Sequence, residues 1–246
     1  MKLTLCVMTL NEIDSMKIIM PRVDTSIFDQ VLVIDGGSTD GTIEWSKEHG
    51  YEIYVQKQRG LRQAYLEALP HIRGDVMITF SPDGNSVPER LPDLVNELKK
   101  GNDMVIVSRY LGEAKSEDDS MVTRFGNWMF TTLINVLHGG KYTDAMVIYR
   151  GYKKSLFHDL QLTDDKAFRI PEKIFFTRVS VEPLLSVRAA RAKLKISEIP
   201  GDEPARIGGE RKLQIIRWGL AFLYQICIES VAGIPAGQKA NGGDRT

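Results

Sequence analysis

Four short apolar runs, separated by helix-like patterns, constrain the fold more strongly than any other feature of this sequence. The runs are rich in β-branched residues and continuous rather than alternating, which is typical of strands covered on both faces. Strands that alternate with helices this often predict right-handed crossovers, and hence an α/β fold with a mainly parallel central sheet and helices on both faces. The predicted strands are Leu3–Met8, Val31–Ile34, Val76–Phe80 and Met104–Val107.

Apolar residues at three- and four-residue spacing predict helices between these strands. The helices cover Thr42–His49, Leu61–Leu69 and Glu89–Lys100. The last of them begins with Ser86-Val87-Pro88-Glu89, which has the spacing of a capping box with proline in the first turn. Gly101 follows as a stop signal.

The regular alternation of predicted strands and helices ends after Arg109. A polar segment, LGEAKSEDDS, comes next, and we interpret its acidic residues Glu117–Asp119 as a solvated loop. We predict one domain over residues 1–232, divided into halves of about 1–110 and 111–232, and a disordered tail over 233–246. The remaining predicted elements are helices over Val122–His138 and Glu182–Arg191, a strand over Lys195–Ile199 and a final helix over Lys212–Glu229.

The bulk composition is typical of an ordinary cytoplasmic protein. The 246 residues carry 32 basic and 32 acidic side chains, so no global basic field attracts nucleic acid. Cys6 and Cys227 form no C-x-x-C pair, which fits a reducing compartment and gives no thiolate metal site. The N-terminus MKLTLCVMTLNE turns polar too soon for a signal peptide. The longest apolar segment, Trp218–Tyr224, is far shorter than the roughly 20 residues that span a bilayer.

Polar residues gather directly after the predicted strands, where an open parallel sheet binds its ligands. Three of the four strand ends carry a carboxylate, and a half-buried carboxylate needs a partner such as a ring N–H, a ribose hydroxyl or a metal ion. For Asp35 and Asp40, an Asx-turn with the neighbouring glycines is the alternative. No G-x-G-x-x-G follows the first strand and no G-x-x-x-x-G-K-[ST] occurs, which argues against dinucleotide and Walker-type sites. The four strand ends are Thr9–Glu12, Asp35–Gly41, Ser81–Asn85 and Ser108–Tyr110.

Several stretches together resemble the family 2 glycosyltransferases with the GT-A fold, in particular the synthases of polyprenyl-phosphate sugars. VLVIDGGSTDGT resembles their second-strand signature, TLNE their P-T-Y-N-E, and RGLRQAYLEAL the helix start after their third strand. SPDGNSVPE resembles the D-x-D segment, SRYLGE the G-S-R-Y stretch and TDAMVIYRGYKK the D-x-x-S-G-F-R-x-F stretch. VEPLLSVRAARAKLKISEIP resembles the closing E-x-E-L-L helix and E-V-P strand. The resemblance implies a nucleotide-binding first half that takes a UDP- or GDP-sugar, and an acceptor-side second half.

The resemblance also implies a metal site. Asp83 falls on the last aspartate of the D-x-D, which implies a ligand for Mg²⁺ or Mn²⁺ that bridges the donor diphosphate. Ser81 replaces the first aspartate, so the side-chain carbonyl of Asn85 or a water would be the second ligand. A plain turn over Asp83-Gly84-Asn85 is the alternative.

The nucleotide itself is assigned by the same resemblance. Asp35 would accept a hydrogen bond from N3–H of the base, and Thr9 and Glu12 would hold the base and the ribose. Arg59 and Gly60 would lie along the nucleotide; a surface arginine beside a helix-start glycine is the alternative. The implied nucleotide-sugar site consists of Thr9, Leu10, Asn11, Glu12, Asp35, Gly36, Arg59, Gly60, Ser81, Pro82 and Asp83.

Basic residues of the loop ARIGGERK are expected to close over phosphates, because guanidinium groups form paired hydrogen bonds to phosphate oxygens. A solvated basic loop is the alternative. The expected phosphate and acceptor residues are Arg109, Arg206, Arg211 and Lys212.

The nature of the acceptor depends on whether a general base is present. A hydroxyl acceptor requires one, and alignment with the family offers Asp144 and Glu182 as catalytic candidates, either of which is otherwise structural. A phosphate acceptor is already an anionic nucleophile at neutral pH. Because the family's Glu-Asp pair is not evident, the sequence favours polyprenyl phosphate over a glycan hydroxyl.

The final helix has two interpretations. Its aromatic and aliphatic residues with flanking Lys and Arg fit a helix lying on the cytoplasmic leaflet of a membrane. Its apolar residues occur almost all round, which instead favours burial in a core or a homodimer interface. We therefore expect a cytoplasmic protein, with peripheral contact at the inner face of the cell membrane or a dimer as the two options.

The expected function is an inverting, metal-dependent glycosyltransferase that uses a nucleotide sugar and acts on a lipid-linked or glycan acceptor. A GT-A-like nucleotidyltransferase is disfavoured, because it requires a glycine-rich loop where this chain has Thr9–Glu12. A non-catalytic module that binds nucleotide sugars is the other rival, motivated by Ser81.

Overall fold

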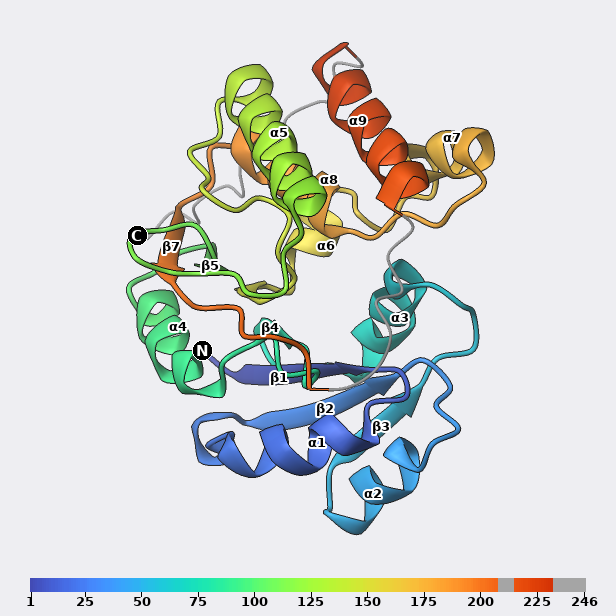
Figure 1. The fold of residues 1–246 in the computed structure, drawn as a ribbon, viewed down its shortest axis with the longest axis vertical. Helices are drawn as coiled ribbons and strands as arrows, with labels where there is room; N and C mark the ends of the chain where they lie inside the picture. Colours follow the sequence, from blue (N-terminus) through green and yellow to red (C-terminus); the bar gives the residue numbers. More distant parts are fainter. Residues whose placement is uncertain (208–214, 232–246) are drawn as a thin grey trace, which may run out of the picture.

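The computed structural model describes residues 1–207 and 215–231, and within them seven strands form one sheet. The strands lie in the order β3-β2-β1-β4-β6-β5-β7, and the sheet runs through the middle of the molecule (Figure 1). Their bounds are β1 Leu3–Thr9, β2 Gln30–Asp35, β3 Glu52–Val55, β4 Val76–Phe80, β5 Met104–Ser108, β6 Arg150–Lys153 and β7 Ile196–Pro200.

The predicted mainly parallel sheet is confirmed. β1 pairs in parallel with β2 and β4, β2 with β3, and β5 with β7. β6 is the antiparallel member and lies between β4 and β5. The four predicted apolar strands and the later strand at Lys195–Ile199 all form, within a residue or two of the expected bounds. β3 and β6 were not predicted, because both are four residues long and carry charged ends.

The predicted helices also form, with shifted ends. The α-helices are α1 Ile13–Ile19, α2 Thr42–Glu48, α3 Leu61–Ala68, α4 Leu91–Lys99, α5 Met121–His138, α6 Leu156–Asp159, α7 Lys166–Phe175, α8 Glu182–Arg191 and α9 Ile215–Val231. Short 3-10 turns occupy Met20–Arg22, Thr25–Ile27, Leu69–His71 and Pro88–Arg90. The final helix was expected from Lys212, but residues 212–214 and the expected disordered tail 233–246 lie outside the described residues.

The predicted capping box at Ser86–Glu89 is wrong. These residues lead into the 3-10 turn Pro88–Arg90, and α4 begins only at Leu91 without a side-chain cap. Glu89 forms an ion pair with Arg22 at 3.0 Å instead of reaching back to the backbone. The proline and the extended Val87 turn the chain before the helix can start. A capping box does form at α5, between Ser120 and Thr123.

Helices cover both faces of the sheet, as predicted. Along β1, Leu5 and Val7 point into a core closed by α1 and α4, while Cys6 and Met8 point into a second core. The second core is closed by α3, α5 and α8, with α9 packed against α5, α7 and α8. Figure 1 shows these helices gathered above the sheet. No helix in the described part of the chain is long and apolar enough to cross a membrane.

Candidate functional site

Asp83 lies directly after β4, at the carboxyl edge of the sheet. Its side chain is buried, and Oδ1 accepts a hydrogen bond from the backbone N–H of Asn85 at 3.1 Å. Oδ2 pairs with Nη1 of Arg206 at 3.2 Å. The backbone N–H of Ile207 donates to the carbonyl of Asp83 at 2.9 Å. The chain segment that carries Arg206 therefore lies across this strand end.

Gly84 permits this close approach. Its φ of +96° favours glycine, and a Cβ built at this position would lie 2.7 Å from the side chain of Ile207. A larger residue would thus push the segment carrying Arg206 away from Asp83.

Asn85 and Asp118 complete a polar cluster around Asp83 and Arg206. Nδ2 of Asn85 donates to Oδ2 of Asp118 at 3.1 Å, and Nη2 of Arg206 lies 3.8 Å from the same oxygen. Oδ1 of Asn85 is buried and has no hydrogen-bond partner among residues 1–207 and 215–231. A buried carbonyl oxygen without a donor, beside a carboxylate, suits a hard cation such as Mg²⁺ or Mn²⁺. Asp83 and Asn85 therefore fit the metal site that the sequence implies.

The interpretation of Glu117–Asp119 as a solvated loop is wrong for two of its three residues. Asp118 joins the cluster around Asp83, and Asp119 accepts a hydrogen bond from the hydroxyl of Tyr110. Both are half-buried, whereas Glu117 is exposed. They lie ten and eleven residues after the end of β5, too far along the loop for the strand-end pattern to identify them.

Asp35 ends β2 with both carboxylate oxygens occupied. Oδ1 accepts from the backbone N–H groups of Gly37 at 2.8 Å and Ser38 at 2.7 Å. Oδ2 accepts from the hydroxyls of Thr9 at 2.8 Å and Ser38 at 2.6 Å. The Asx-turn alternative is thus what the structure shows at Asp35, and a nucleotide base would have to displace one of these donors.

The loop after β1 is tied to the loop after β2. Asn11, with φ of +56°, donates its backbone N–H to Oγ of Ser38 at 2.8 Å and accepts from the N–H of Thr39 at 2.8 Å. The buried Glu12 donates its backbone N–H to Oγ1 of Thr42 at 3.0 Å. Leu10 is exposed and packs over Gly36, where a Cβ would lie 3.1 Å from the leucine side chain.

Asp40 also links the loops that follow β1 and β2. Burial raises the pKa of the Asp40 carboxyl. Hydrogen bonds from the hydroxyl and N–H of Thr42 and from the N–H of Ile13 together lower it by more, so the net pKa lies below its ordinary value. Asp40 is therefore ionised in the neutral range and anchors the start of α2 to the start of α1.

Arg59 and Gly60 lie at the start of α3. Gly60 has φ of +117° and precedes the helix, so the helix-start alternative describes it. The Arg59 side chain is exposed, and its carbonyl accepts a hydrogen bond from Nη1 of Arg178. The two residues do not line the cavity described below.

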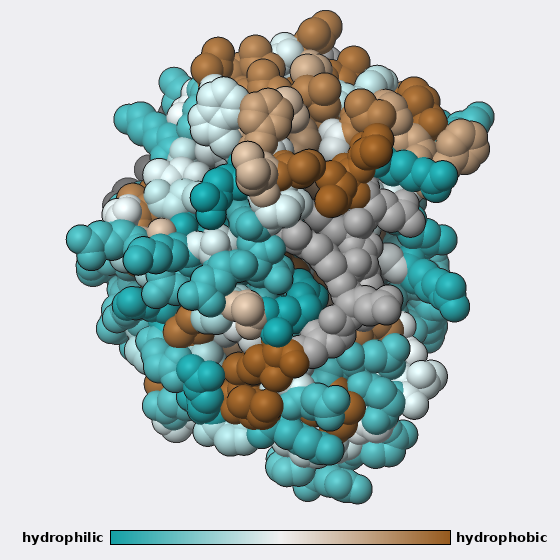
Figure 2. Space-filling view, viewed as in Figure 1, coloured by the Kyte–Doolittle hydropathy of each residue, from teal (hydrophilic) through white to brown (hydrophobic). Residues whose placement is uncertain are grey.

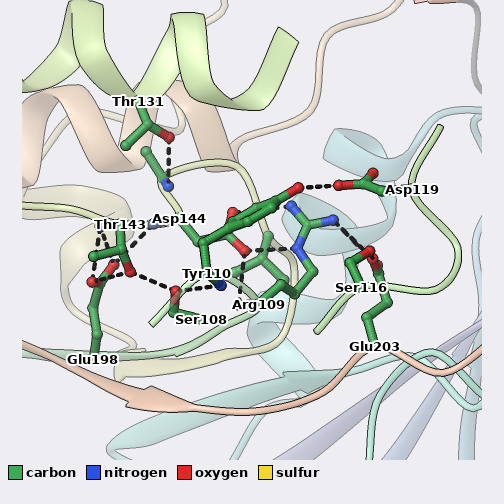
Figure 3. Close-up of polar contacts among 12 residues, drawn as sticks. Ser108, Arg109, Tyr110, Ser116, Asp119, Thr131, Thr143, Asp144, Glu198 and Glu203 are labelled. Carbon is green, nitrogen blue, oxygen red and sulfur yellow. Dashed lines mark hydrogen bonds and ion pairs between the residues drawn. The ribbon is translucent and has the colours of Figure 1, made fainter. Parts of the chain in front are cut away.

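Arg109 follows β5 and lies between two acidic residues (Figure 3). Its Nε and Nη2 donate to the two carboxylate oxygens of Asp144 at 2.6 and 3.0 Å, and its Nη1 lies 3.2 Å from Glu203. Burial raises the pKa of the Glu203 carboxyl, although Arg109 and the hydroxyl of Ser116 oppose that shift. Sequence reasoning missed Glu203, which comes from a distant part of the chain.

Asp144 is fully buried behind Arg109. Its backbone N–H donates to Glu198 on β7 at 3.2 Å, and Thr143 donates its own N–H to the same carboxylate at 2.8 Å. Figure 3 shows Glu198 and Arg109 on opposite sides of this turn. Asp144 does not line the cavity, so in this arrangement it positions Arg109 and has no access to an acceptor.

Glu182 begins α8 and lines the cavity. Its Oε1 accepts a hydrogen bond from the hydroxyl of Tyr65 at 2.7 Å. Burial, together with the charge of Glu182, raises the pKa of Tyr65 well above its ordinary value. Tyr65 therefore remains a donor, and it fixes the orientation of the carboxylate.

Arg150 of β6 forms hydrogen bonds with the chain segment that makes one wall of this cavity. It is fully buried, and its donors reach the carbonyl of Val147 at 2.7 Å, the carbonyl of Ala145 at 3.1 Å and Oγ of Ser186 at 3.0 Å. Met146 and Val147 line the cavity. Arg150 thus gives the segment 145–147 its shape, a role that the sequence did not indicate.

A cavity of about 660 Å³ connects the carboxyl edge of the sheet with the helices above it. One end is polar and carries Asp83, Arg109, Asp118, Glu182 and Arg206. The other end is apolar and lies between α5 and α9, where it is lined by Val122, Phe125, Met129, Ile216, Leu220 and Leu223.

The cavity unites part of the expected site. Ser81, Asp83, Asn85, Arg109, Glu182 and Arg206 line it. Pro82 is buried beside Asp83, while Thr9–Glu12, Asp35 and Gly36 form the neighbouring strand ends outside its lining. Arg211 and Lys212 lie outside the described residues.

A mainly parallel sheet with helices on both faces, and acidic and basic residues converging beyond its strand ends, is the GT-A architecture of glycosyltransferases. The chain belongs to glycosyl transferase family 2, whose sequence model matches residues 4–161. It is accordingly a glycosyltransferase.

Curated relatives agree with this assignment, and a solved structure shares the fold. Glycosyltransferase AglJ of Haloferax volcanii is 28% identical over 87% of this chain and 68% of its own length. An undecaprenyl-phosphate mannosyltransferase of Micrococcus luteus is 26% identical over 92% of this chain and 97% of its own length. The glucosyl-3-phosphoglycerate synthase of Mycobacterium tuberculosis, solved with Mn²⁺, uridine diphosphate and phosphoglyceric acid, shares the fold with a TM-score of 0.64. It is 17% identical over 92% of this chain and 78% of its own.

Proposed function

We propose that this enzyme transfers a sugar from a nucleoside-diphosphate sugar, UDP- or GDP-linked, to a polyprenyl phosphate, with inversion at the anomeric carbon. The observation that carries the proposal is the two-ended cavity. Its polar end, at Asp83 and Arg206, suits a diphosphate and a phosphate, and its apolar end, between α5 and α9, suits a prenyl chain. The Micrococcus luteus relative is named for a substrate of this class.

Asp83 and Asn85 would hold a divalent metal ion, Mg²⁺ or Mn²⁺. The ion would supply positive charge to the departing diphosphate, with phosphate and water oxygens as its further ligands. Ser81 replaces a possible second carboxylate, and the unpartnered Oδ1 of Asn85 offers the replacement ligand. The Mn²⁺ and uridine diphosphate in the related fold support this proposal.

Arg206 would bind phosphate oxygens once a metal ion takes its place at Asp83. The charge of Arg109 is already balanced by Asp144 and Glu203. Arg109 would therefore help to orient a ligand at the cavity wall without adding net positive charge. The nucleotide would lie across the ends of β1 and β2, where Thr9, Glu12 and Asp35 are held by the crossing hydrogen bonds of the two loops. Leu10 and Gly36 would form the apolar edge of that surface.

The transfer itself would need no general base. An oxygen of the acceptor phosphate forms the new bond to the anomeric carbon while the bond to the β-phosphate oxygen breaks, and the nucleoside diphosphate leaves with that electron pair. The acceptor oxygen is anionic at neutral pH, so no proton has to be removed. The burial of Asp144 behind Arg109 supports this mechanism, because it takes one of the two candidate bases out of reach.

A glycan hydroxyl is the second candidate acceptor. This acceptor is favoured by Glu182, whose carboxylate lines the cavity and is oriented by a hydrogen bond from the hydroxyl of Tyr65. A general base of this kind would accept the hydroxyl proton. Ser81 in place of an aspartate also motivated a non-catalytic nucleotide-sugar module, but the match to glycosyl transferase family 2 supports an enzyme instead.

The test is a thermal-shift panel of UDP-, GDP- and dTDP-sugars, with and without Mn²⁺, on the wild type and Asp83→Ala. We expect one nucleotide to stabilise the wild type in a metal-dependent way, and the variant to lose that dependence. The matched transfer assay compares polyprenyl phosphate, the same prenol without phosphate, and a glycan. Transfer to the unphosphorylated prenol or the glycan, but not to the phosphate, would reject the proposed acceptor.

A further inference from the structure

The helices above the sheet expose an unusual amount of apolar surface. On α5, Phe125 is 60%, Trp128 61% and Val136 75% exposed, and on α9 Ile216 is 77% and Val231 80% exposed. Figure 2 shows this hydrophobic surface gathered at the end of the molecule that Figure 1 assigns to α5 and α9. α7, which packs against α9, adds Ile170, Ile174 and Phe176. Contiguous apolar surface on this scale marks an interaction site.

The exposed charges within these helices are basic, although the exposed Asp164 and Asp165 directly precede α7. Along α5, α7 and α9, every exposed charged side chain is basic, although the whole chain carries a formal net charge of zero. The two acidic residues of these helices face inward, where Glu172 pairs with Arg62 and the buried Glu229 pairs with Arg188. The exposed basic residues are Arg124, Lys166, Arg169, Lys173 and Arg217.

The apolar surface is continuous with the cavity of the proposed acceptor site. Val122, Phe125, Ile215, Ile216 and Leu220 are both exposed at the surface and part of the cavity lining. An apolar chain held between α5 and α9 would therefore leave the protein through this surface. A second copy of the chain would meet it with the same five basic side chains, so self-association brings like charges together.

We infer that the exposed faces of α5, α7 and α9 form a docking surface for an anionic lipid bilayer. Apolar side chains enter the boundary between headgroups and acyl chains, and the basic side chains lie among anionic headgroups. The inference deepens the proposed function: it places the apolar mouth of the cavity against the phase in which a polyprenyl chain dissolves.

The test is flotation of the full chain with phosphatidylcholine vesicles, with and without phosphatidylglycerol, containing no polyprenyl phosphate. We expect the wild type to float with the vesicles and to prefer the anionic ones. Tryptophan fluorescence should shift to the blue and be quenched by brominated lipid, a signal that Trp128→Phe reduces because Trp128 is 61% exposed on α5. Arg124→Gln and Arg217→Gln should each lower the affinity for anionic vesicles, by about five-fold.

The decisive variant is Trp128→Ser with Val136→Ser, because neither residue lines the cavity. We expect it to stay in the unbound fraction, while the matched control Ile18→Ser, a 51% exposed residue on α1, floats like the wild type. Circular dichroism and thermal denaturation establish that each variant is folded. The inference is overturned if the wild type does not float or if the double variant floats equally well.

Two further outcomes distinguish membrane docking from self-association of the chain and from the proposed function. If light scattering shows a dimer that the double variant dissociates, and vesicles do not bind, the surface belongs to a second copy and the inference is overturned. If the chain floats but no nucleotide sugar stabilises it, the docking surface stands and the proposed function fails.

Discussion

The guanidinium of Arg206 lies 3.2 Å from the carboxylate of Asp83, the residue that we propose as a metal ligand. This ion pair neutralises Asp83 when no donor is bound, so metal binding has to compete with it. We predict that Arg206→Ala binds Mn²⁺ alone more tightly than the wild type does, but binds the nucleotide sugar more weakly. Calorimetric titration of each ligand measures both effects.

Arg206→Lys is the matched control for this prediction. Lysine keeps the charge but has no fork for paired hydrogen bonds, so we expect Mn²⁺ affinity near that of the wild type and an intermediate loss for the donor. Equal Mn²⁺ affinity in the wild type and Arg206→Ala would show that the ion pair does not occupy the metal site.

Asp144 is predicted to support stability rather than act as a base. Asp144→Asn would leave Arg109 buried with Glu203 as its remaining charge partner, and breaking such a pair costs about 3 kcal/mol of unfolding free energy. Urea denaturation measures this loss. A variant with wild-type stability and a large loss of kcat would instead identify Asp144 as catalytic.

Glu182→Gln distinguishes the two candidate acceptors. The amide oxygen of glutamine still accepts from Tyr65, so the cavity wall should be retained. With a phosphate acceptor we expect kcat to fall less than about ten-fold, whereas loss of a general base costs about a hundred-fold or more. A loss of that size, together with a changed pH profile, would favour the hydroxyl acceptor.

His138 should make the stability depend on pH. It is buried at the end of α5, and its Nε2–H donates to the carbonyl of Ile226 on α9 at 2.9 Å. Burial lowers its pKa below the ordinary 6.5, although the Ile226 hydrogen bond opposes this. The unfolded chain therefore takes up a proton first, and the unfolding free energy falls as the pH drops through 6.5.

His138→Gln is the variant that measures this contribution. Glutamine keeps a donor for Ile226 but does not titrate. We expect a smaller difference between urea midpoints at about pH 7.5 and about pH 5.5 than in the wild type. The same difference in both proteins would place the pH dependence elsewhere.

Arg150→Met should destabilise the cavity wall. Removing the guanidinium leaves the carbonyl of Val147 without its donor, at a cost of about 1–3 kcal/mol, whereas the carbonyl of Ala145 keeps the hydroxyl of Ser186. Urea denaturation gives the stability, and the donor thermal shift gives the effect on the site. We expect a loss in both, and an unchanged stability would contradict the role assigned to Arg150.

Much of the fold was predictable because its strands are apolar and buried on both faces. The pattern failed where burial depends on tertiary position. β6 reads RGYK and contains a buried arginine, so nothing in its local sequence indicates a central strand. α7 was missed although its apolar residues fall on one face, because Pro171 and its several charges argue against a helix in isolation.

The candidate site was predictable where it follows the strand ends. Asp83, Asn85 and Arg109 come directly after β4 and β5, and the geometry of a parallel sheet brings them together. Asp118, Glu203 and Glu198 were missed, because they reach Asn85, Arg109 and the turn at Asp144 from loops and a strand far away in the sequence. Such pairings depend on side-chain packing, which spacing alone does not reveal.

The antiparallel strand β6 joins the two halves of the chain inseparably. It comes from the part of the chain after residue 110, yet it bonds to β4 on one side and β5 on the other, both of which come before that residue. A fragment ending near residue 110 would therefore leave β5 without either of its sheet partners, expose one edge of β4 and uncover the core that α5 and α8 close, so it would aggregate rather than fold. Neither part of this chain can therefore be exchanged as an independent module.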